Sequence, residues 1–307
     1  MRRYILKKSA FLLFSLFVVI SITFFLMQLV PGDPFTEDKA IPEEIMKALY
    51  HHYGLDDPWY MQYVRYLKGV VTWNFGPSFK HEARLVTEII ENGFPVSFLL
   101  GGEALLIALF LGIPLGATAA LKRMRGGDRL VVTLAILGIS VPSFILATFL
   151  QYILAMKLDL LPVARWGSFA QTILPALSLA ALPTAYIAKL TRANMIEVLQ
   201  QDYIQTARSK GLNSFQILWF HALRNALLPV VTYLGSLSTA IMTGSFVVEK
   251  IFGIPGLGYW FVMSVLNRDY TVIMGTTVFY SALLLVTIFL VDLIYLLIDP
   301  RMRRGAS

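Results

Sequence analysis

Long apolar segments alternate with short polar stretches along almost the whole chain. The apolar segments are approximately residues 9–30, 95–121, 129–156, 171–190, 227–248 and 270–298. At 1.5 Å per residue the first of them reaches roughly 33 Å, which is enough to cross the hydrocarbon core of a bilayer. Because lipid cannot satisfy an open backbone, each segment is predicted to be a helix. The pattern predicts an all-α, polytopic membrane protein with six transmembrane helices.

Composition supports this prediction. Hydrophobic residues make up 57% of the 307 residues and charged residues only 15%, whereas a soluble domain carries about 25% charged residues. The absence of cysteine excludes disulfides and thiolate metal sites. The first apolar segment is too long for a cleaved signal peptide and lacks a small-x-small cleavage site, so we expect it to be retained as a helix.

The distribution of lysine and arginine predicts the orientation. More than half of the 26 basic residues lie in the two tails and in two of the loops: Arg2, Arg3, Lys7, Lys8, Lys122, Arg123, Arg125, Arg129, Lys189, Arg192, Arg208, Lys210, Arg224, Arg301, Arg303 and Arg304. The positive-inside rule places all four stretches, and hence both termini, in the cytoplasm. The net charge of +7 is thereby explained by topology, and no basic surface is left to indicate a nucleic-acid partner.

These segments divide the chain into regions. We predict an N-terminal transmembrane helix (1–30), an extracytoplasmic segment with amphipathic helices (31–94), a core transmembrane domain of five helices (95–298) that contains a cytoplasmic loop (191–226), and a cytoplasmic tail (299–307). In the outer segment, Asp57-Pro58 is typical of a helix N-cap followed by a first-turn proline. Apolar residues then follow at helical spacing: Tyr60, Val64, Leu67 and Val71. A second short helix is predicted over 82–92, ending at Gly93.

The loop between the fourth and fifth apolar segments is unusually polar and helix-prone. Asp202 is suited to cap a short helix, and Gly211 is suited to end it. Ala207 is small, which would let this helix approach another surface closely. A further helical stretch over 214–223 leads back to the membrane at Pro229. The pattern predicts a helix–turn–helix in the cytoplasm, either a docking element for a partner or a solvated hairpin.

This loop resembles the cytoplasmic loop of ABC-importer permeases, whose pattern is Glu-Ala-Ala, three residues, Gly, nine residues, Ile-x-Leu-Pro. Ala207, Gly211 and Leu223 match that pattern. Four positions depart from it: Gln205, Thr206, His221 and Arg224.

Other stretches resemble the peptide/nickel branch of the same family. They are Leu29-Val-Pro-Gly-Asp-Pro-Phe35, Tyr53-Gly-Leu-Asp-Asp-Pro58, Asn74-Phe-Gly-Pro-Ser-Phe79, Tyr203 to Leu212, Val248 to Gly258, Asn267-Arg-Asp269 and Asp299-Pro-Arg301. Spread over nearly the full length, they resemble the first of the two permease subunits of a bacterial inner-membrane oligopeptide or dipeptide importer, with oligopeptide favoured by Phe75 to Phe79 and the exit at Pro34-Phe-Thr36.

The resemblance implies a type I importer fold and a set of partners. The chain would form a heterodimer with a second homologous permease, and two cytoplasmic ATPase subunits would power it. An extracytoplasmic binding protein would deliver the peptide. The chain itself has no Gly-x-x-x-x-Gly-Lys-Ser/Thr motif, so we expect it to be a non-enzymatic subunit without catalytic residues or bound cofactor, with ATP and Mg²⁺ on the partner ATPases.

The same resemblance names candidate site residues. The ATPase-coupling candidates are Asp202, Tyr203, Gln205, Thr206, Ala207, Arg208, Lys210, Gly211, Leu212, His221 and Leu223. The candidates for the external gate or for contact with the binding protein are Phe252, Pro255, Gly256, Gly258, Arg268 and Asp269.

Several polar and kink-forming residues have structural interpretations. Glu103 and Asp292 are intramembrane carboxylates, which are functional candidates by default, but we interpret both as structural, with Asp292 near Asp299-Pro-Arg301. Prolines interrupt the predicted spans and are expected to kink them: Pro114, Pro142, Pro175 and Pro183. His51 and His52 lack further ligands, so no metal site is expected.

Alternatives remain open at this point. A permease for dipeptides, nickel or another small solute shares most of these motifs. A free-standing secondary carrier would show inverted repeats and several central ionisable groups, which are not evident. A membrane scaffold would differ from an importer in transporting no solute.

Overall fold

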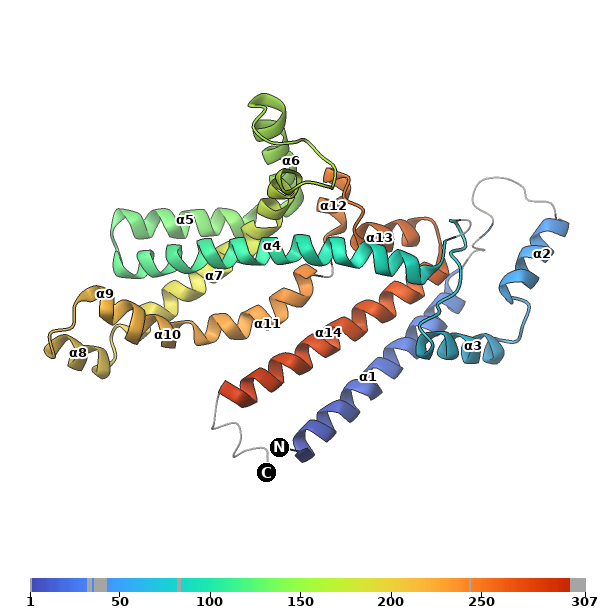
Figure 1. Ribbon diagram of the computed structural model, residues 1–307, viewed down its shortest axis with the longest axis horizontal. Coiled ribbons are helices and arrows are strands. Elements are labelled where there is room, and N and C mark those ends of the chain that lie inside the picture. The colour runs from blue at the N-terminus through green and yellow to red at the C-terminus, as the bar shows by residue number, and fades with distance from the viewer. Residues whose placement is uncertain (1, 32–34, 36–42, 82–83, 243, 299–307) are drawn as a thin grey trace. The chain divides into compact units, whose positions relative to one another are not determined.

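The computed structural model describes residues 2–31, 35, 43–81, 84–242 and 244–298, and these are built almost entirely of helices (Figure 1). The helices are α1 (Arg2–Leu29), α2 (Glu43–Tyr53), α3 (Trp59–Val71), α4 (Val86–Leu121), α5 (Gly126–Ser140), α6 (Ser143–Leu150), the π-helical η1 (Gln151–Lys157), α7 (Phe169–Val198), α8 (Asp202–Ser209), α9 (Ser214–Gln216), the π-helical η2 (Ile217–Ala222), α10 (Leu223–Ala226), α11 (Leu228–Met242), α12 (Phe246–Phe252), α13 (Leu257–Leu266) and α14 (Tyr270–Ile298). Two compact units are formed, one from Met1–Pro95 with Gly256–Ser307 and the other from Val96–Pro255.

Four helices are long and apolar enough to cross a membrane, namely α1, α4, α7 and α14. Two of the predicted spans are divided between helices in the structure. The predicted span 129–156 divides at Val141-Pro142 into α5 and α6–η1, which meet at 104°. The predicted span 227–248 ends as α11 at Met242, and Val248 belongs to α12. The bend at Pro142 confirms the kink predicted there, α11 ends at Met242 rather than near the predicted residue 248, and the count of six spans stays a prediction.

Proline explains the break after α5 but does not break the other helices. Pro142 has no amide hydrogen to donate, and the backbone before it is extended at Val141. In contrast, α4 runs through Pro114, and α7 runs through Pro175 and Pro183. Packed neighbours make proline tolerable within a transmembrane helix, so these three prolines do not end their helices, and the kinks expected there stay a prediction.

In the unit formed by Met1–Pro95 and Gly256–Ser307, α1 and α14 pack side by side (Figure 1). Helix α3 lies against α1 through aromatic rings, with Tyr66 stacked on Phe24 at 5.8 Å and Tyr63 on Phe25 at 5.6 Å. A hydrogen bond of 2.6 Å joins the hydroxyls of Ser21 and Tyr63. This anchoring turns the periodic apolar face of α3 outward, where Tyr60, Val64 and Val71 are exposed.

Two local predictions for the outer segment were wrong. Helix α3 begins at Trp59 with Pro58 in the N-cap position, because the Asp57 carboxylate accepts a hydrogen bond from Arg65 instead of capping. The helix predicted to stop at Gly93 continues as α4. Gly93 is buried where α13 begins, and a Cβ there would lie 3.1 Å from the Leu257 backbone. The glycine serves close packing rather than helix termination.

In the unit formed by Val96–Pro255, small residues bring α4 close to α7. A Cβ on Gly112 would lie 2.8 Å from Cγ2 of Ile187, and one on Gly116 would lie 2.4 Å from the carbonyl oxygen of Ala188. Such spacing of small residues is a common way for membrane helices to approach each other. Helix α7 also packs against α5, α6 and α11, so it is the central helix of this unit.

Candidate functional site

Helix α8 and the turn that ends it form the centre of the candidate coupling loop. Gly211 adopts a left-handed conformation with φ of +80°. Its N–H donates to the Arg208 carbonyl at 2.9 Å, and the N–H of Leu212 donates to the Ala207 carbonyl at 3.3 Å. This pair of bonds is the Schellman arrangement, which favours glycine because it has no Cβ. The prediction that Gly211 ends the helix is confirmed.

The start of α8 differs from the prediction. Gln201 occupies the N-cap position, without a side-chain cap, and Asp202 is the first helical residue. Asp202 therefore does not cap the helix as predicted. Its carboxylate still lies in the first turn, where negative charge interacts favourably with the helix dipole.

One face of α8 belongs to the protein's own core. Ile204 is fully buried and Ala207 is 6% exposed, and both lie in a cluster with Met195, Ile217 and Leu223. Leu212 packs against the same cluster. The small side chain of Ala207 lets α8 lie close to the core of its own unit, and a role of Ala207 in contact with an ATPase stays a prediction. The matching Leu223 is likewise a core residue.

The other face of α8 is exposed and polar. It presents Tyr203, Gln205, Thr206, Arg208 and Lys210. Tyr203 is held in place because its hydroxyl accepts a hydrogen bond of 2.8 Å from the Asn225 side chain. His221 is half-buried in η2, apart from this face of α8 in the chain. The coupling candidates are thus of two kinds: some are buried in the core of their unit, and the others are exposed on the outer face of α8.

An ion pair that sequence reasoning missed joins the nearby ends of α5 and α7. Asp128 is 3% exposed and accepts from Arg192 through both carboxylate oxygens, Nε to Oδ1 at 2.5 Å and Nη2 to Oδ2 at 2.8 Å. The N–H of Met124 donates to the same carboxylate at 2.9 Å. The one available signal was an isolated acid among the basic residues of this loop.

The candidates for the external gate divide between the two units. Phe252, in the unit of Val96–Pro255, is 1% exposed in a core cluster, whereas Pro255 is exposed. In the other unit, Gly256 and Gly258 are buried at the start of α13.

The last two external candidates lie just before α14. Arg268 is half-buried with φ of +55°. Asp269 is 1% exposed; it accepts from the Ser78 hydroxyl and from the Phe79 N–H at 3.1 Å. This carboxylate holds the outer segment in place rather than facing a partner.

Three further carboxylates lie in or near the spans. Lys8 of α1 donates to Asp292 of α14, whereas the predicted neighbours at 299–301 lie outside the described residues. Glu103 is half-buried. Glu249, missed from the sequence, is fully buried and accepts from the Ser97 hydroxyl at 2.8 Å. In the parts of the chain that the structure describes, no group of three or more His, Asp or Glu is placed to hold a metal ion.

Two compact helical units with several helices long and apolar enough to cross a membrane define a polytopic membrane protein. Residues 112–304 match the family model described as binding-protein-dependent transport system inner membrane component, and residues 1–101 match the N-terminal model of the same system. The chain belongs to this family, and it is a multi-pass protein of the inner membrane.

Curated relatives align over almost the whole chain. It is 51% identical over 303 residues to the dipeptide transport system permease protein DppB of Bacillus subtilis, covering 99% of this chain and 98% of that protein. It is 42% identical over 305 residues to the oligopeptide transport system permease protein OppB of Haemophilus influenzae and to that of Escherichia coli strain K12, covering 99% of this chain and all of each relative.

A solved structure supports the fold alone. An inward-facing form of the MetNI methionine ABC transporter has a chain that superposes with a TM-score of 0.54 at 17% identity, covering 71% of this chain and 96% of that chain. The expected type I importer fold agrees with this likeness.

Proposed function

We propose that this chain is a membrane subunit of an ATP-driven importer and forms, with a second homologous permease, the passage for oligopeptides delivered by an external binding protein. Two cytoplasmic ATPase subunits power the cycle, and both termini face the cytoplasm. The names of the relatives support the peptide as solute, because alignment extends over nearly every residue of both chains.

The observation that best supports the driven role is the two-sided character of α8. Ile204 and Ala207 fix the helix to the core of its unit, while Tyr203, Thr206 and Arg208 remain at the surface. A helix that is rigidly attached on one side and polar on the other transmits a push from a partner to the spans behind it. A solvated hairpin without a partner would not require such anchoring.

The mechanism is a bias between two conformations. The ATPases bind one conformation of α8 and its unit better than the other, and ATP binding and hydrolysis shift the balance between them. Because α8 packs against η2 and shares one apolar cluster with Ala117 and Ala120 of α4 and Met195 of α7, a displacement of α8 is transmitted to both helices through this cluster. The bends at Val141-Pro142 and before α11 are places where such a movement is absorbed.

The experiment is ATP-dependent uptake of a labelled peptide by proteoliposomes that contain the complex purified from its native membrane. Uptake that requires ATP, the binding protein and this chain is the expected result. Uptake without ATP, driven by a proton or sodium gradient, would overturn the proposal in favour of a secondary carrier.

Dipeptides are the second candidate solute. The Bacillus subtilis relative, with 51% identity, is named a dipeptide permease. Competition of unlabelled dipeptides against labelled penta- or hexapeptides in the same vesicles separates the two solutes, because the preferred length inhibits at the lower concentration.

A further inference from the structure

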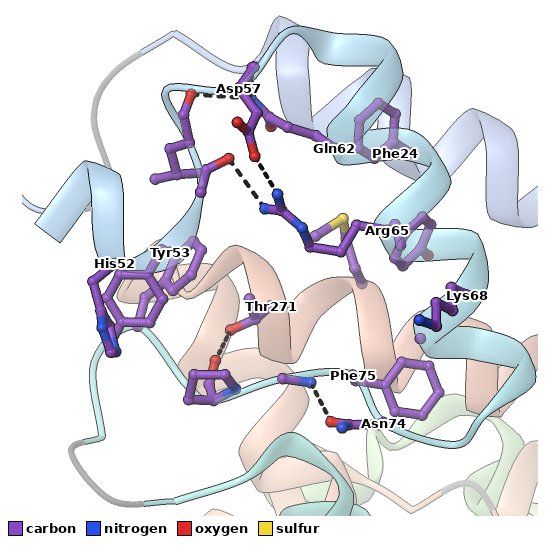
Figure 2. Close-up of a pocket in the computed structure, with 18 of the residues that line it drawn as sticks. Phe24, His52, Tyr53, Asp57, Gln62, Arg65, Lys68, Asn74, Phe75 and Thr271 are labelled. Atoms are coloured by element: carbon purple, nitrogen blue, oxygen red, sulfur yellow. Dashed lines mark hydrogen bonds and ion pairs between the residues drawn. The ribbon is translucent and has the colours of Figure 1, made fainter.

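A groove of about 910 Å³ lies in the unit formed by Met1–Pro95 and Gly256–Ser307, whereas the candidate coupling loop belongs to the other unit (Figure 2). Its volume falls within the ~300–1,000 Å³ range of small-ligand sites. Six parts of the unit line it: Phe24 of α1, the end of α2, the turn between α2 and α3, one side of α3, the segment Asn74–Phe79, and the start of α14. We propose that this groove is a binding site for a short peptide with free, charged ends, an inference that rests on the proposed function.

The groove-facing side of α3 is a polar stripe. Gln62, Arg65, Lys68 and Thr72 all line the groove; spaced three or four residues apart, they share one side of the helix. The aromatic side of α3 is occupied by α1, and its third side is the exposed apolar face. Neither packing against α1 nor the exposed apolar face accounts for the polar residues of this stripe.

Three of the four stripe side chains are engaged in building the walls. Arg65 donates to the Gly54 carbonyl at 3.3 Å and to the Asp57 carboxylate. Gln62 donates to the carbonyls of Leu55 at 3.0 Å and Asp57 at 2.8 Å. The Thr72 hydroxyl donates to a carbonyl of its own helix, that of Lys68, at 2.8 Å. The bonds of Arg65 and Gln62 fix the α2–α3 turn before any ligand arrives, which lowers the entropy cost of binding.

Lys68 is different. Figure 2 shows its ammonium group on one wall, with Asp57 at another edge of the groove. No carboxylate pairs with Lys68 among the residues that the structure describes. A lysine directed into a groove with no anion beside it is suited to hold the carboxylate end of a ligand.

The charged residues of the lining favour a ligand that carries both a positive and a negative group. Arg65 and Lys68 are balanced by Asp56 and Asp57, so the lining has no net charge apart from its two histidines. A simple anion or cation would gain little from such a lining. A zwitterion whose carboxylate meets Lys68 and whose ammonium meets Asp56, an exposed residue of the rim, uses both signs.

The wall opposite α3 supplies the contacts that a peptide backbone and side chains need. Segment Asn74–Phe79 follows α3 and begins close to it, because a Cβ on Gly69 of that helix would lie 2.6 Å from the Asn74 carbonyl oxygen. Tyr53 and Phe79 pack edge to face at 4.7 Å and present aromatic surface to the groove.

That wall is held in place by residues at the start of α14 and just before it. The Thr271 hydroxyl donates to the Pro77 carbonyl at 2.9 Å, and the Asp269 carboxylate binds the Ser78 hydroxyl and the Phe79 N–H. Asp269 is thereby a positioning residue for the groove, which gives a role to a carboxylate that is too buried to face a partner.

The test measures equilibrium binding of tritiated trialanine to the purified complex in nanodiscs, without binding protein and without ATP. Trialanine blocked by N-acetylation and C-amidation is the matched ligand, because it keeps the backbone and loses both charges. We expect unblocked trialanine to bind and the blocked form to bind much more weakly. Equal binding of the two forms would overturn the proposal.

The variants locate the site. K68Q is expected to weaken trialanine binding by at least about tenfold, the loss of one charge-assisted contact, and K68R, which keeps the charge, is expected to retain binding. K47Q, on the exposed surface of α2 outside the groove, is the control and should bind as the unmodified protein does. Thermal melting of each complex establishes that the variants fold.

Unchanged binding in a folded K68Q complex would overturn the inference. So would a change in co-purified anionic lipid with no change in trialanine binding, because the groove would then hold a lipid headgroup. ATP-driven peptide uptake, measured in parallel, separates this result from the proposed function. If the complex takes up peptide but K68Q binds trialanine normally, only the assignment of the groove as a peptide site is overturned. If the complex takes up no peptide at all, the proposed function is overturned.

Discussion

Arg192 binds Asp128 through two parallel hydrogen bonds across 64 residues of sequence, and thereby joins the start of α5 to the last turns of α7. Both helices pack in the unit that carries α8. A bidentate pair fixes direction as well as distance. The position of α7, from which the coupling loop emerges, is therefore set by this pair as well as by apolar packing.

Removal of one partner should destabilise the complex. In R192A the buried Asp128 carboxylate keeps only the Met124 N–H, at a cost on the order of 2–3 kcal/mol because Arg192 is itself partly exposed. R192K keeps the positive charge but cannot make the two parallel hydrogen bonds, so its stability should lie between that of R192A and that of the unmodified protein. Thermal melting of the purified complex measures this. The control R129A removes a neighbouring exposed arginine and should melt normally; an equal loss in R129A would contradict the account.

Close packing of α4 on α7 makes Gly116 intolerant of a side chain. The Cβ of a leucine at this position would meet the Ala188 carbonyl oxygen at 2.4 Å and Thr191 Cβ at 2.7 Å. We expect G116L to lower stability by about 1–3 kcal/mol through overpacking and to reduce the yield of folded complex. G102L is the matched control on the same helix, because nothing lies within 4 Å of a Cβ there. Size-exclusion profiles and melting temperatures of the two variants should differ clearly.

The turn after α8 requires a left-handed residue at Gly211. A β-branched side chain is strained at φ of +80°, and an L-residue in this region costs roughly 1–2 kcal/mol. G211V should lower ATP-coupled uptake while membrane insertion is unchanged. Asparagine tolerates this conformation, so G211N should retain most of the uptake. Normal uptake by G211V would show that coupling does not require the left-handed turn at Gly211.

Neighbouring positions on α8 should respond oppositely to a thiol reagent. The chain has no cysteine, so T206C and A207C each introduce one reactive group. T206C is on the exposed face and should react with a maleimide in the isolated chain and be protected when the ATPases are bound. A207C faces the core and should react slowly in both states. Protection of neither site by the ATPases would contradict docking on this face.

Local features of the sequence predicted the structure well where one residue decides the conformation. Gly211 ends α8 as predicted because no neighbour competes with its left-handed turn. The long apolar runs of α1 and α14 needed no knowledge of their partners.

Predictions failed where a distant contact decides. Asp57 looked like a cap, but Arg65 takes its carboxylate. Gly93 looked like a helix end, but it lies against α13, more than 160 residues later in the chain. The small size of Ala207 predicted a close approach of α8 to another surface, but only the folded unit reveals that this surface is the protein's own core. The pair of Asp128 and Arg192 was not predicted for the same reason.

The measurement that tests the central claim most directly is the composition of the native complex. The chain should be solubilised gently from its native membrane and its stoichiometric companions identified by mass spectrometry. The account predicts a second, distinct permease and ATPase subunits, with the binding protein captured in some preparations. A chain that purifies alone, or as a stable homo-oligomer without any ATPase, would contradict it.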